Sequence, residues 1–457
     1  MSERRNVTLG EEIDFLTGFP FESGSYSDGE GDIKLLRGDN IAQGFLRWDD
    51  VKKWPASQKS NYKQFELQEG DVVLAMDRPW IEAGLKYASV SMHDLPCLLV
   101  QRTARMRGGK NLDTVYLKYI IGSPWFSKYI QKITTGSLVP HISGSQIKDF
   151  PLKLQRLGEQ KKIVRVLSSI DQKIEINNRI NAELEAMAKT LYDYWFVQFD
   201  FPFDFAQGTP DVNGKPYKSS GGKMVYNEEL KREIPAGWMI QPIAKWIASD
   251  KSGDWGQETL QGNYNKRVTC IRGTDINGLK GKSKLSPPIR YILSKNEQKL
   301  LESHDLIIEI SGGSPSQSTG RLAYITEETL RRFNDSLICS NFCKAISLKN
   351  KHTFFTFIYL WSQLYDSGAF FGWEGKTSGI KNLLFEAFAN SHEVEMPPDD
   401  LHQVFYKVLR PVEAKKQKVL LENQHLSELR DWLLPMLMNG QVQVTETNDT
   451  KAAETQY

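Results

Sequence analysis

Residues 157–196 read LGEQKKIVRVLSSIDQKIEINNRINAELEAMAKTLYDYWF, with no proline and no glycine after Gly158. Apolar side chains recur along this stretch in alternating steps of three and four residues, which is the spacing of a coiled-coil seam. They are Ile163, Leu167, Ile170, Ile174, Leu184 and Leu191. The pattern predicts one long helix, and at ~1.5 Å per residue it would reach about 60 Å, more than a globular domain needs.

A second stretch, residues 400–438, repeats the first at a constant offset. The matched pairs are Leu167 with Leu409, Ile170 with Val412, Leu184 with Leu426, Met187 with Leu429, and Leu191 with Leu433. We predict that the two helices pair antiparallel, so that an approximate twofold axis relates the globular parts that precede them. Asn181 and Asn423 hold equivalent seam positions, where a polar residue either fixes the register or marks a solvated stretch. Pro411 is expected to kink the second helix.

The segments that precede the two helices also match each other, motif by motif. The first contains LLRGDNI, GDVVLAM, GLKYASV, LLVQRTARM, YLKYIIGSPWF and TTGSLVPHISGSQIKDFPL. The second contains VTCIRGTDI, HDLIIEISGG, GRLAYIT, LICSNFCKAISL, FFTFIYLWSQLY and GKTSGIKNLLFEAF. Six matches in one order favour an internal duplication over two unrelated segments with a similar pattern. Short β-branched runs separated by Gly, Asp and Ser predict a strand-rich body with a few helices in each copy.

Together these patterns predict an α+β chain with two globular domains, a long antiparallel two-helix coiled coil and a pseudo-twofold internal repeat. Its length of 457 residues accommodates them, since domains usually have ~100–200 residues. The expected parts are a first domain (1–153), a first long helix (154–198), a Gly-, Pro- and Ser-rich connector (199–237), a second domain (238–396), a second long helix (397–440) and a disordered tail (441–457).

The composition is that of an ordinary intracellular protein. Lys and Arg number 58 against 56 Asp and Glu, and a net charge of +2 excludes polyanion binding by bulk charge while leaving room for local basic surfaces. Four cysteines cannot form a disulfide framework in so long a chain. The first residues lack the apolar core of a secretion signal, and no stretch approaches the ~18–20 apolar residues of a membrane span.

Motifs for catalysis and for metal binding are missing from the sequence. It has no GxxxxGK[ST] phosphate loop and no dinucleotide fingerprint, and SPPI lacks the aromatic of the [DNS]PP[YFW] motif of amino-methyltransferases. Asp305 and Glu309 approach a nuclease pattern, but Ser311 stands where that pattern needs a lysine. Cys339 and Cys343 have no second pair at zinc-ligand spacing, which favours buried thiols. We therefore predict no catalytic residue and no metal site.

The class of function that remains is binding through loops. Side chains that can contact phosphates or base edges recur at matched places in the two copies. The expected nucleic-acid contacts are Arg37, Asn40, Arg78, Lys86, Ser137 and His141 in the first copy, and Arg272, Thr274, Arg321, Lys376, Ser378 and Lys381 in the second. Large apolar residues near the helix ends predict either a docking surface for a partner protein or packing against the chain's own domains. They are Tyr194, Trp195, Phe196, Trp432, Leu433 and Leu437.

With these motifs in view, the chain resembles the DNA-specificity subunit of type I restriction-modification enzymes over nearly its whole length. The most specific parts are the junction ISGSQIKDFPLKLQRLGEQKKIVRVLSSIDQKIEINNRI and the connector SGGKMVYNEELKREIPAGW. The chain departs from the family at the second junction, FANSHEVEMPPDDLHQVFYKVLRPVEAKKQ, which matches the usual IPLPxxxEQ form poorly.

The resemblance implies a non-catalytic subunit of the bacterial cytoplasm that serves defence against foreign DNA. Each globular domain would be a target-recognition domain that reads one half of a bipartite, asymmetric site. The helices would act as a ruler and as the platform for two modification (methyltransferase) subunits, with two restriction-translocation subunits completing the enzyme. S-adenosylmethionine, ATP and Mg²⁺ would be bound by those partners and no cofactor by this chain. The alternatives are a protein-binding coiled-coil scaffold without DNA recognition, the recognition subunit of a methylation-only complex, and a nuclease in its own right.

Overall fold

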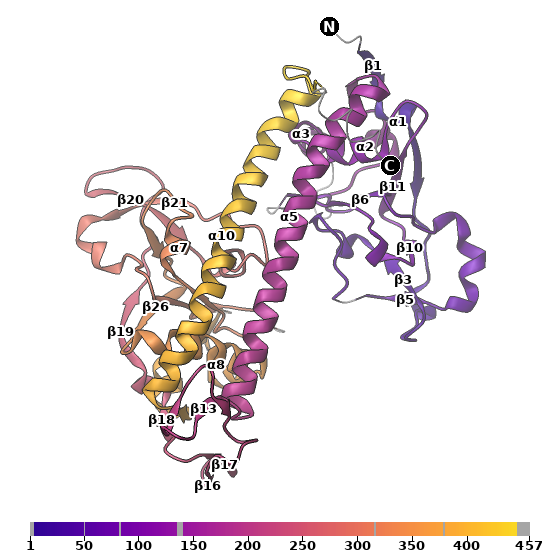
Figure 1. The fold of residues 1–457 in the computed structure, drawn as a ribbon. Helices are drawn as coiled ribbons and strands as arrows, with labels where there is room; N and C mark the ends of the chain where they lie inside the picture. Colours follow the sequence, from indigo (N-terminus) through magenta and orange to yellow (C-terminus); the bar gives the residue numbers. More distant parts are fainter. Residues whose placement is uncertain are drawn as a thin grey trace. The chain divides into compact units, whose positions relative to one another are not determined.

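The computed structural model describes residues 4–49, 51–81, 84–134, 140–314, 317–377 and 380–445. The chain divides into two compact units: unit 1 comprises residues 1–173 and 426–457, and unit 2 comprises residues 174–425. Each unit contains β-sheets and a part of both long helices (Figure 1). The predicted α+β class, with strand-rich bodies and two long paired helices, is confirmed.

Unit 1 is built on two sheets, of strand order β2-β11-β6-β9-β4 and β10-β3-β5. β6 is a fully buried run of apolar residues, as a strand covered on both faces is, and β3 is buried and apolar except at Lys34. The bounds are β2 (Ile13–Thr17), β3 (Ile33–Leu36), β4 (Gln43–Gly44), β5 (Lys53–Trp54), β6 (Val72–Ala75), β9 (Tyr87–Ser89), β10 (Cys97–Leu99) and β11 (Thr103–Gly108). The helices are α1 (Leu9–Glu12), α2 (Thr114–Ile121), α3 (Pro124–Ile133) and α4 (Gly144–Lys148), and β1 (Arg5–Thr8) pairs with β12 (Pro151–Leu154).

Unit 2 has sheets of strand order β19-β26-β22-β24, β21-β20-β25 and β23-β28-β27. Their bounds are β19 (Ile247–Ser252), β20 (Tyr264–Ile271), β21 (Ile289–Leu293), β22 (Leu306–Glu309), β23 (Ser311–Gly312), β24 (Leu322–Tyr324), β25 (Leu337–Cys339), β26 (Cys343–Leu348), β27 (Glu374–Thr377) and β28 (Ile380–Leu383). The helices are α6 (Ile276–Leu279), α7 (Glu327–Leu330), α8 (Phe354–Asp366) and α9 (Phe385–Ser391), and β18 (Met239–Pro242) pairs with β29 (Glu393–Met396).

The two units repeat one topology, which confirms the predicted internal repeat. β3 runs parallel to β10 as β20 does to β25, and β6 lies between β11 and β9 as β22 lies between β26 and β24. The aspartate before the central strand, in a Gly-Asp pair in unit 1 and a His-Asp pair in unit 2, has the same structural role in both units. Asp71 accepts a 2.8 Å hydrogen bond from the backbone N–H of Gln68, and Asp305 accepts one of 2.8 Å from Glu302. Each carboxylate thereby closes the turn that leads into the strand.

The long helices are α5 (Leu157–Tyr192), which ends in a π-helical turn at Asp193–Val197, and α10 (Asp399–Met438), which is helical through Pro411. They pair antiparallel in each unit, α5 magenta and α10 yellow in Figure 1. In unit 1 Arg430 donates to Asp171 at 3.0 Å, and in unit 2 Asn177 donates to Asn423 at 2.9 Å. Asn423 thus has two polar partners on α5, since it also donates to Asn178 at 2.8 Å. Both amide atoms of Asn181 are buried without a hydrogen-bond partner in the described part of the chain.

Each unit has its own apolar core. In unit 1 the seam residues Ile163 and Leu167 pack with Leu434 and Leu437 of α10. In unit 2 the core includes residues of the connector, which the sequence marked only as loop-rich. Its strands are β13 (Pro202–Asp204), β14 (Thr209–Pro210), β15 (Lys215–Pro216), β16 (Met224–Asn227) and β17 (Arg232–Pro235), and the buried side chains are Phe199, Phe201, Tyr217 and Ile234. The connector is therefore part of unit 2's folded body. All four cysteines are buried free thiols.

His402 of α10 is 1% exposed in the core of unit 2, stacked on Phe196, with Nδ1 3.0 Å from the Thr356 hydroxyl. Burial lowers its pKa to about 4. The unfolded chain takes up this proton below about pH 6.5 and the folded chain only below about pH 4, so stability should fall as the pH falls through that window, by up to about 3 kcal/mol. Urea unfolding between pH 4 and 7.5 would measure the slope. His402→Gln should flatten it, and an equal slope in the variant would refute this assignment.

Candidate nucleic-acid interface

In unit 1 the end of β3, the end of β6 and the start of β9 meet at one place. A Cβ added to Gly38, after β3, would lie 3.9 Å from the Ala75 side chain, and the N–H of Ala75 donates to the Lys86 carbonyl at 3.0 Å. Unit 2 repeats the arrangement. A Cβ at Gly273 would meet Glu309 Oε1 at 2.6 Å, and the N–H of Glu309 donates to the Arg321 carbonyl at 2.9 Å. Ala75 and Glu309 are therefore equivalent, as are Lys86 and Arg321.

The loop after β3 is held in shape by its own side chains. Asn40 is 5% exposed; its Oδ1 accepts the Arg37 N–H at 3.0 Å and its Nδ2 donates to the Arg47 carbonyl at 3.2 Å. The oxygen and the nitrogen of the Asn40 amide therefore both hydrogen-bond within the loop, and Asn40 serves to shape the loop and not to contact a ligand. Arg37 is half-buried with Asp39 3.4 Å from its guanidinium, and Arg47 Nε donates to the Asp39 carbonyl at 2.8 Å.

Lys86 lies beneath this loop and is 9% exposed. Within the described part of the chain its ammonium makes no hydrogen bond or ion pair, because Ala75 stands where unit 2 has the carboxylate of Glu309. Burial lowers the pKa of Lys86; Asp39 counteracts this, and Arg47 and Arg78 add to it. The charges that act on Lys86 are thus two cations and one carboxylate, and such an excess of positive charge is the electrostatic character of a phosphate or guanine contact.

A segment from late in unit 1 completes this face. The backbone N–H of Arg78 donates to the Pro140 carbonyl at 2.7 Å, which holds Pro140–Ile142 along the end of β6. His141 Nδ1 lies 2.6 Å from Asp77 Oδ1, and Arg78 is exposed with a positive φ of 45°. The structure therefore brings Arg37, Lys86, Arg78 and His141 to one face of unit 1. Ser137 lies outside the described residues.

In unit 2 three of the predicted residues, Arg272, Thr274 and Arg321, line one pocket of about 610 Å³. Arg272 Nε donates to Asp275 at 2.8 Å, and Arg321 makes a two-point contact with Glu309 at 2.6 and 2.7 Å. The hydrogen bonds to Glu309 raise the pKa of Arg321. Each guanidinium is thus held by a carboxylate, whereas Lys86 in unit 1 is not.

β28 occupies in unit 2 the place of the His141 segment in unit 1. Ser311 pairs with Asn382 and Gly312 with Lys381, and the Lys381 ammonium lies 3.0 Å from Glu374 and is 16% exposed. Lys376 lies in β27, paired with Lys381, and its side chain is outside the described residues, as is Ser378.

Sequence reasoning missed two exposed residues at the tight turn before the last long strand of each body. Phe342, 52% exposed, lines the unit 2 pocket, and its carbonyl accepts the Ile310 N–H at 2.9 Å. Arg102, with a 61% exposed side chain, is its equivalent in unit 1, because its carbonyl accepts the Met76 N–H at 2.9 Å. The match between the motifs LLVQRTARM and LICSNFCKAISL, which contain Arg102 and Phe342, is the sequence signal that could have indicated them. Trp255 also lines the unit 2 pocket, with the Arg290 guanidinium 3.9 Å from the centre of its ring.

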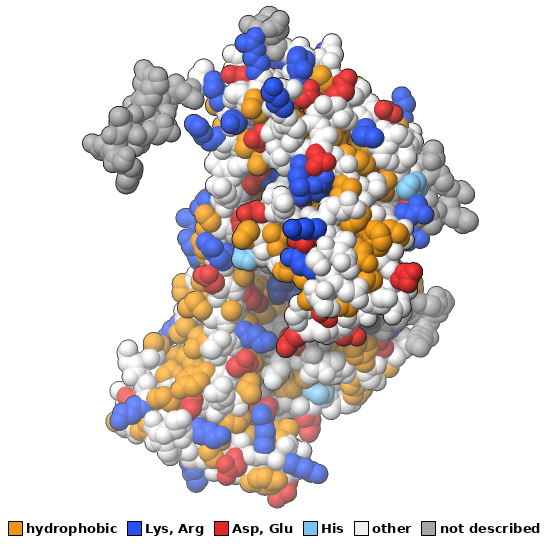
Figure 2. Space-filling view, turned by 90° about the vertical axis from the view of Figure 1, so that its right-hand side faces the viewer, with side chains coloured by type: hydrophobic (Ala, Val, Ile, Leu, Met, Phe, Trp, Pro, Cys, Tyr) orange, Lys and Arg blue, Asp and Glu red, His pale blue; other side chains and the backbone are white. Residues whose placement is uncertain are grey.

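The face of the molecule shown in Figure 2 carries mixed charge. Basic and acidic side chains are interspersed there, with apolar patches between them. This agrees with the net charge of +2 and places any attraction for polyanions in local clusters.

The residues predicted to dock a partner divide between surface and core. Tyr194 is 37% exposed and Trp432 is 56% exposed. Trp195 and Phe196 are buried in the core of unit 2, where both rings contact Phe405. Leu437 is buried in the core of unit 1 and Leu433 packs against that core. Packing within the chain therefore accounts for most of this set, and Tyr194 and Trp432 remain accessible.

The described ranges contain neither a metal-binding cluster nor a helix that could span a membrane. No group of three or more His, Cys, Asp or Glu side chains there is arranged to hold a metal ion. Nor does any helix within those ranges have the length and apolar character that crossing a membrane requires.

Comparisons with known proteins agree on one family. Residues 22–186 match the type I restriction modification DNA specificity domain. The type I restriction enzyme EcoAI specificity subunit of Escherichia coli is 35% identical over 186 residues, 40% of this chain and 30% of that protein. The HindI specificity subunit of Haemophilus influenzae is 22% identical over 443 residues, 90% of this chain and 94% of that protein. The match thus spans about a third of the first relative and nearly all of the second.

A solved structure shares the fold. The crystal structure of the type I restriction-modification system S subunit from M. genitalium superposes with a TM-score of 0.51 at 14% identity, over 98% of this chain and 97% of that one. At this identity the likeness concerns the fold, and it extends over both units.

Proposed function

Because the chain belongs to the family of type I restriction-modification specificity subunits, which is non-catalytic, we propose that it recognises a bipartite, asymmetric DNA site and directs methylation and restriction by partner subunits. Residues 1–153 and 238–396 are the proposed target-recognition domains. The observation that carries this proposal is the equivalence of the two basic strand-end loops, with Arg37 and Lys86 in unit 1 and Arg272 and Arg321 in unit 2.

The chemistry of the two loops supports recognition of duplex DNA. Arginine can contact guanine O6 and N7 or a phosphate with two donors, and lysine neutralises phosphates. In unit 1 we infer that Lys86 and Arg78 bind phosphates or guanine edges, with Arg102 beside them. In unit 2 the exposed ring of Phe342 is suited to an apolar contact with a thymine methyl group. Ser137, Lys376 and Ser378 remain proposed contacts.

The long helices are proposed to set the distance between the half-sites. In both units α5 and α10 are joined by partly buried polar contacts, such as Asp171 with Arg430 and Glu185 with Lys416. We infer that this pairing is rigid enough to act as a ruler, and that Tyr194 and Trp432 offer docking positions for two modification subunits. Two restriction-translocation subunits would complete the complex, and S-adenosylmethionine, ATP and Mg²⁺ would be bound by the partners.

Shortening both helices by seven residues, 174–180 in α5 and 421–427 in α10, tests the ruler. One heptad from each helix keeps the seam in register and removes about 10 Å, which corresponds to roughly three base pairs. Mapping methylated adenines in DNA modified by the variant with its methyltransferase partner should show the same half-sites and a gap shorter by about that amount. An unchanged gap would exclude the helices as the ruler.

Sequence-specific recognition itself is tested by the same mapping with the unaltered chain, together with a salt titration of DNA affinity. A bipartite methylated motif and an affinity that falls steeply with salt are expected, because counterions are released when phosphates are bound. A chain that supports no sequence-specific methylation and whose partner contacts are insensitive to salt would instead be a protein-binding scaffold.

A further inference from the structure

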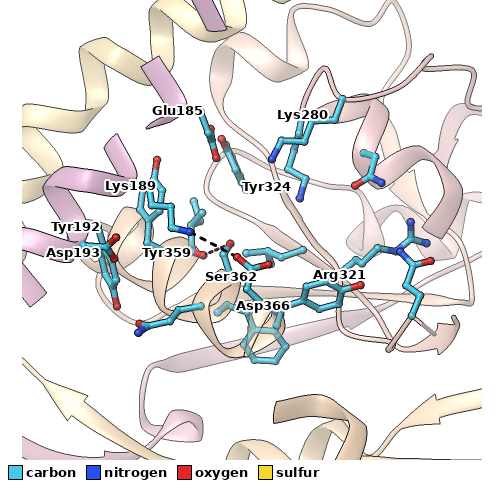
Figure 3. Close-up of a pocket in the computed structure, with 18 residues that line it drawn as sticks. Glu185, Lys189, Tyr192, Asp193, Lys280, Arg321, Tyr324, Tyr359, Ser362 and Asp366 are labelled. Atoms are coloured by element: carbon cyan, nitrogen blue, oxygen red, sulfur yellow. Dashed lines mark hydrogen bonds and ion pairs between the residues drawn. The ribbon is translucent and has the colours of Figure 1, made fainter. Parts of the chain in front are cut away.

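A second pocket of unit 2, of about 400 Å³, lies beside α5 and α8 (Figure 3). α5 contributes Glu185 and Lys189, and α8 contributes Tyr359 and Asp366. Lys280, just after α6, enters it from the opposite side (Figure 3). Arg321 borders both this pocket and the pocket lined by Arg272 and Thr274.

The carboxylates of Glu185 and Asp366 in this pocket have cationic partners of their own, although the charge of Glu185 also acts on Lys280 and raises its pKa. Glu185 accepts a hydrogen bond from Lys416, and Asp366 lies 4.0 Å from Lys189 in the ion pair drawn in Figure 3. Glu309, the partner of Arg321, is likewise taken. Asp193 lies at the far end of the pocket beside Tyr192 (Figure 3).

Lys280 and Lys282 have no such partner. Among the described residues neither ammonium makes a hydrogen bond or ion pair. Lys280 is partly buried, and burial, followed by the charge of Lys282, lowers its pKa to about 8. Two neighbouring cations in a recess, one of them desolvated, form an arrangement that a bound anion would stabilise.

Tyr359 adds a neutral donor to the same pocket. Its hydroxyl has no hydrogen-bond partner within the described ranges, and burial raises its pKa, so that it stays protonated and able to donate. Two ammonium groups and a phenolic hydroxyl are the donors that a phosphate group takes, since phosphate offers several acceptor oxygens and negative charge.

We propose that this pocket of unit 2 binds a phosphate group, held by Lys280 and Lys282 with a hydrogen bond from Tyr359. The site goes beyond DNA recognition by the strand-end loops. The phosphate belongs either to a free phosphorylated compound or to a nucleic-acid backbone; its chemistry is the same in both cases.

Calorimetric titration of the full chain with pyrophosphate, at pH 8 and constant ionic strength, tests the proposal without DNA or partner subunits. Saturable binding at one site is expected. Because the pKa of Lys280 is lowered to about 8, part of the population is neutral at pH 8 and binding of an anion should take up a fraction of a proton. Repeating the titration in buffers of different ionisation enthalpy measures this uptake. Lys280→Gln should weaken binding by about 10- to 100-fold and abolish the proton uptake.

Lys284→Gln is the matched control, because Lys284 is an exposed lysine of the same loop that does not line the pocket. It should bind pyrophosphate as the unaltered chain does. Lys280→Gln should unfold at the same temperature or higher, since it removes an unpaired, partly buried cation. Absence of pyrophosphate binding, or equal weakening by both substitutions, would overturn the proposal.

A competition experiment then identifies the source of the phosphate. Displacement of pyrophosphate by a 40-base-pair duplex of mixed sequence would assign the site to a DNA phosphate, and undiminished binding in its presence would assign it to a free phosphorylated compound. Either result supports phosphate binding, and neither depends on whether the strand-end loops read DNA.

Discussion

Lys86→Met is expected to lower DNA affinity by about 10- to 100-fold while leaving unit 1 at least as stable as before. A charge-assisted hydrogen bond contributes on the order of 1.5–3 kcal/mol, which sets the expected loss of binding. Stability should not suffer because the Lys86 residue is 9% exposed and its ammonium has no partner in the described structure, so that folding gains nothing from its charge. Methionine fills nearly the same space.

The measurements are DNA affinity as a function of salt, and urea unfolding. Removal of one phosphate contact should reduce the slope of log affinity against log salt by about 0.9. Lys110→Met is the control, since Lys110 is an exposed lysine beyond the end of β11 that lies away from the strand-end loops. If Lys86→Met unfolds unit 1, or binds DNA with unaltered affinity and salt slope, Lys86 is a structural residue and not a DNA contact.

Arg321→Met should destabilise unit 2 by about 3–5 kcal/mol. The substitution leaves the carboxylate of Glu309, 3% exposed, buried without its partner, and breaking a buried ion pair in this way is far costlier than replacing both members. Urea unfolding followed by tryptophan fluorescence would measure the loss.

The double variant Arg321→Met with Glu309→Ala provides the contrast. It reproduces in unit 2 the alanine that unit 1 has at Ala75, and most of the lost stability should return because no unpaired charge stays buried. A double variant no more stable than Arg321→Met would show that the cost lies in the packing of the arginine and not in the stranded carboxylate.

Lys86 and Arg321 hold equivalent places in the two units but play different parts. Lys86 and Arg321 immediately precede equivalent strands, but only Arg321 faces a carboxylate. The residue of the neighbouring strand that hydrogen-bonds to each of them is Glu309 in unit 2 and Ala75 in unit 1. Their positions in the sequence predicted both as nucleic-acid contacts. The structure separates them into a cation free to bind a ligand and a guanidinium held in an ion pair.

The same distinction applies to the rest of the predicted interface. Arg272, Thr274 and Arg321 were chosen because they recur at matched loops, and they do line one pocket. Asn40 was chosen for its amide, which the structure uses to close the loop through Arg37 and Arg47. Hydrogen bonds between residues several positions apart depend on the path of the backbone, which residue type alone does not reveal.

What the sequence determined by itself is periodic or repeated. The three-and-four spacing from Ile163 to Leu191 and its copy in α10 predicted the helix pair, and six ordered motifs predicted the duplicated body. Both signals can be read from the sequence because helical period is a local property and a duplication repeats motifs in the same order along the chain. Tertiary structure alone decided which side chains meet. It buried Trp195 and Phe196 against Phe405, and it left Lys86 and Lys280 without an ion-pair partner in the described chain. It also joined Asn423 to Asn177 and Asn178, while the buried Asn181 amide has no hydrogen-bond partner among the described residues. Burial and charge pairing arise from residues far apart in sequence, so they are set only when the sheets and helices have packed.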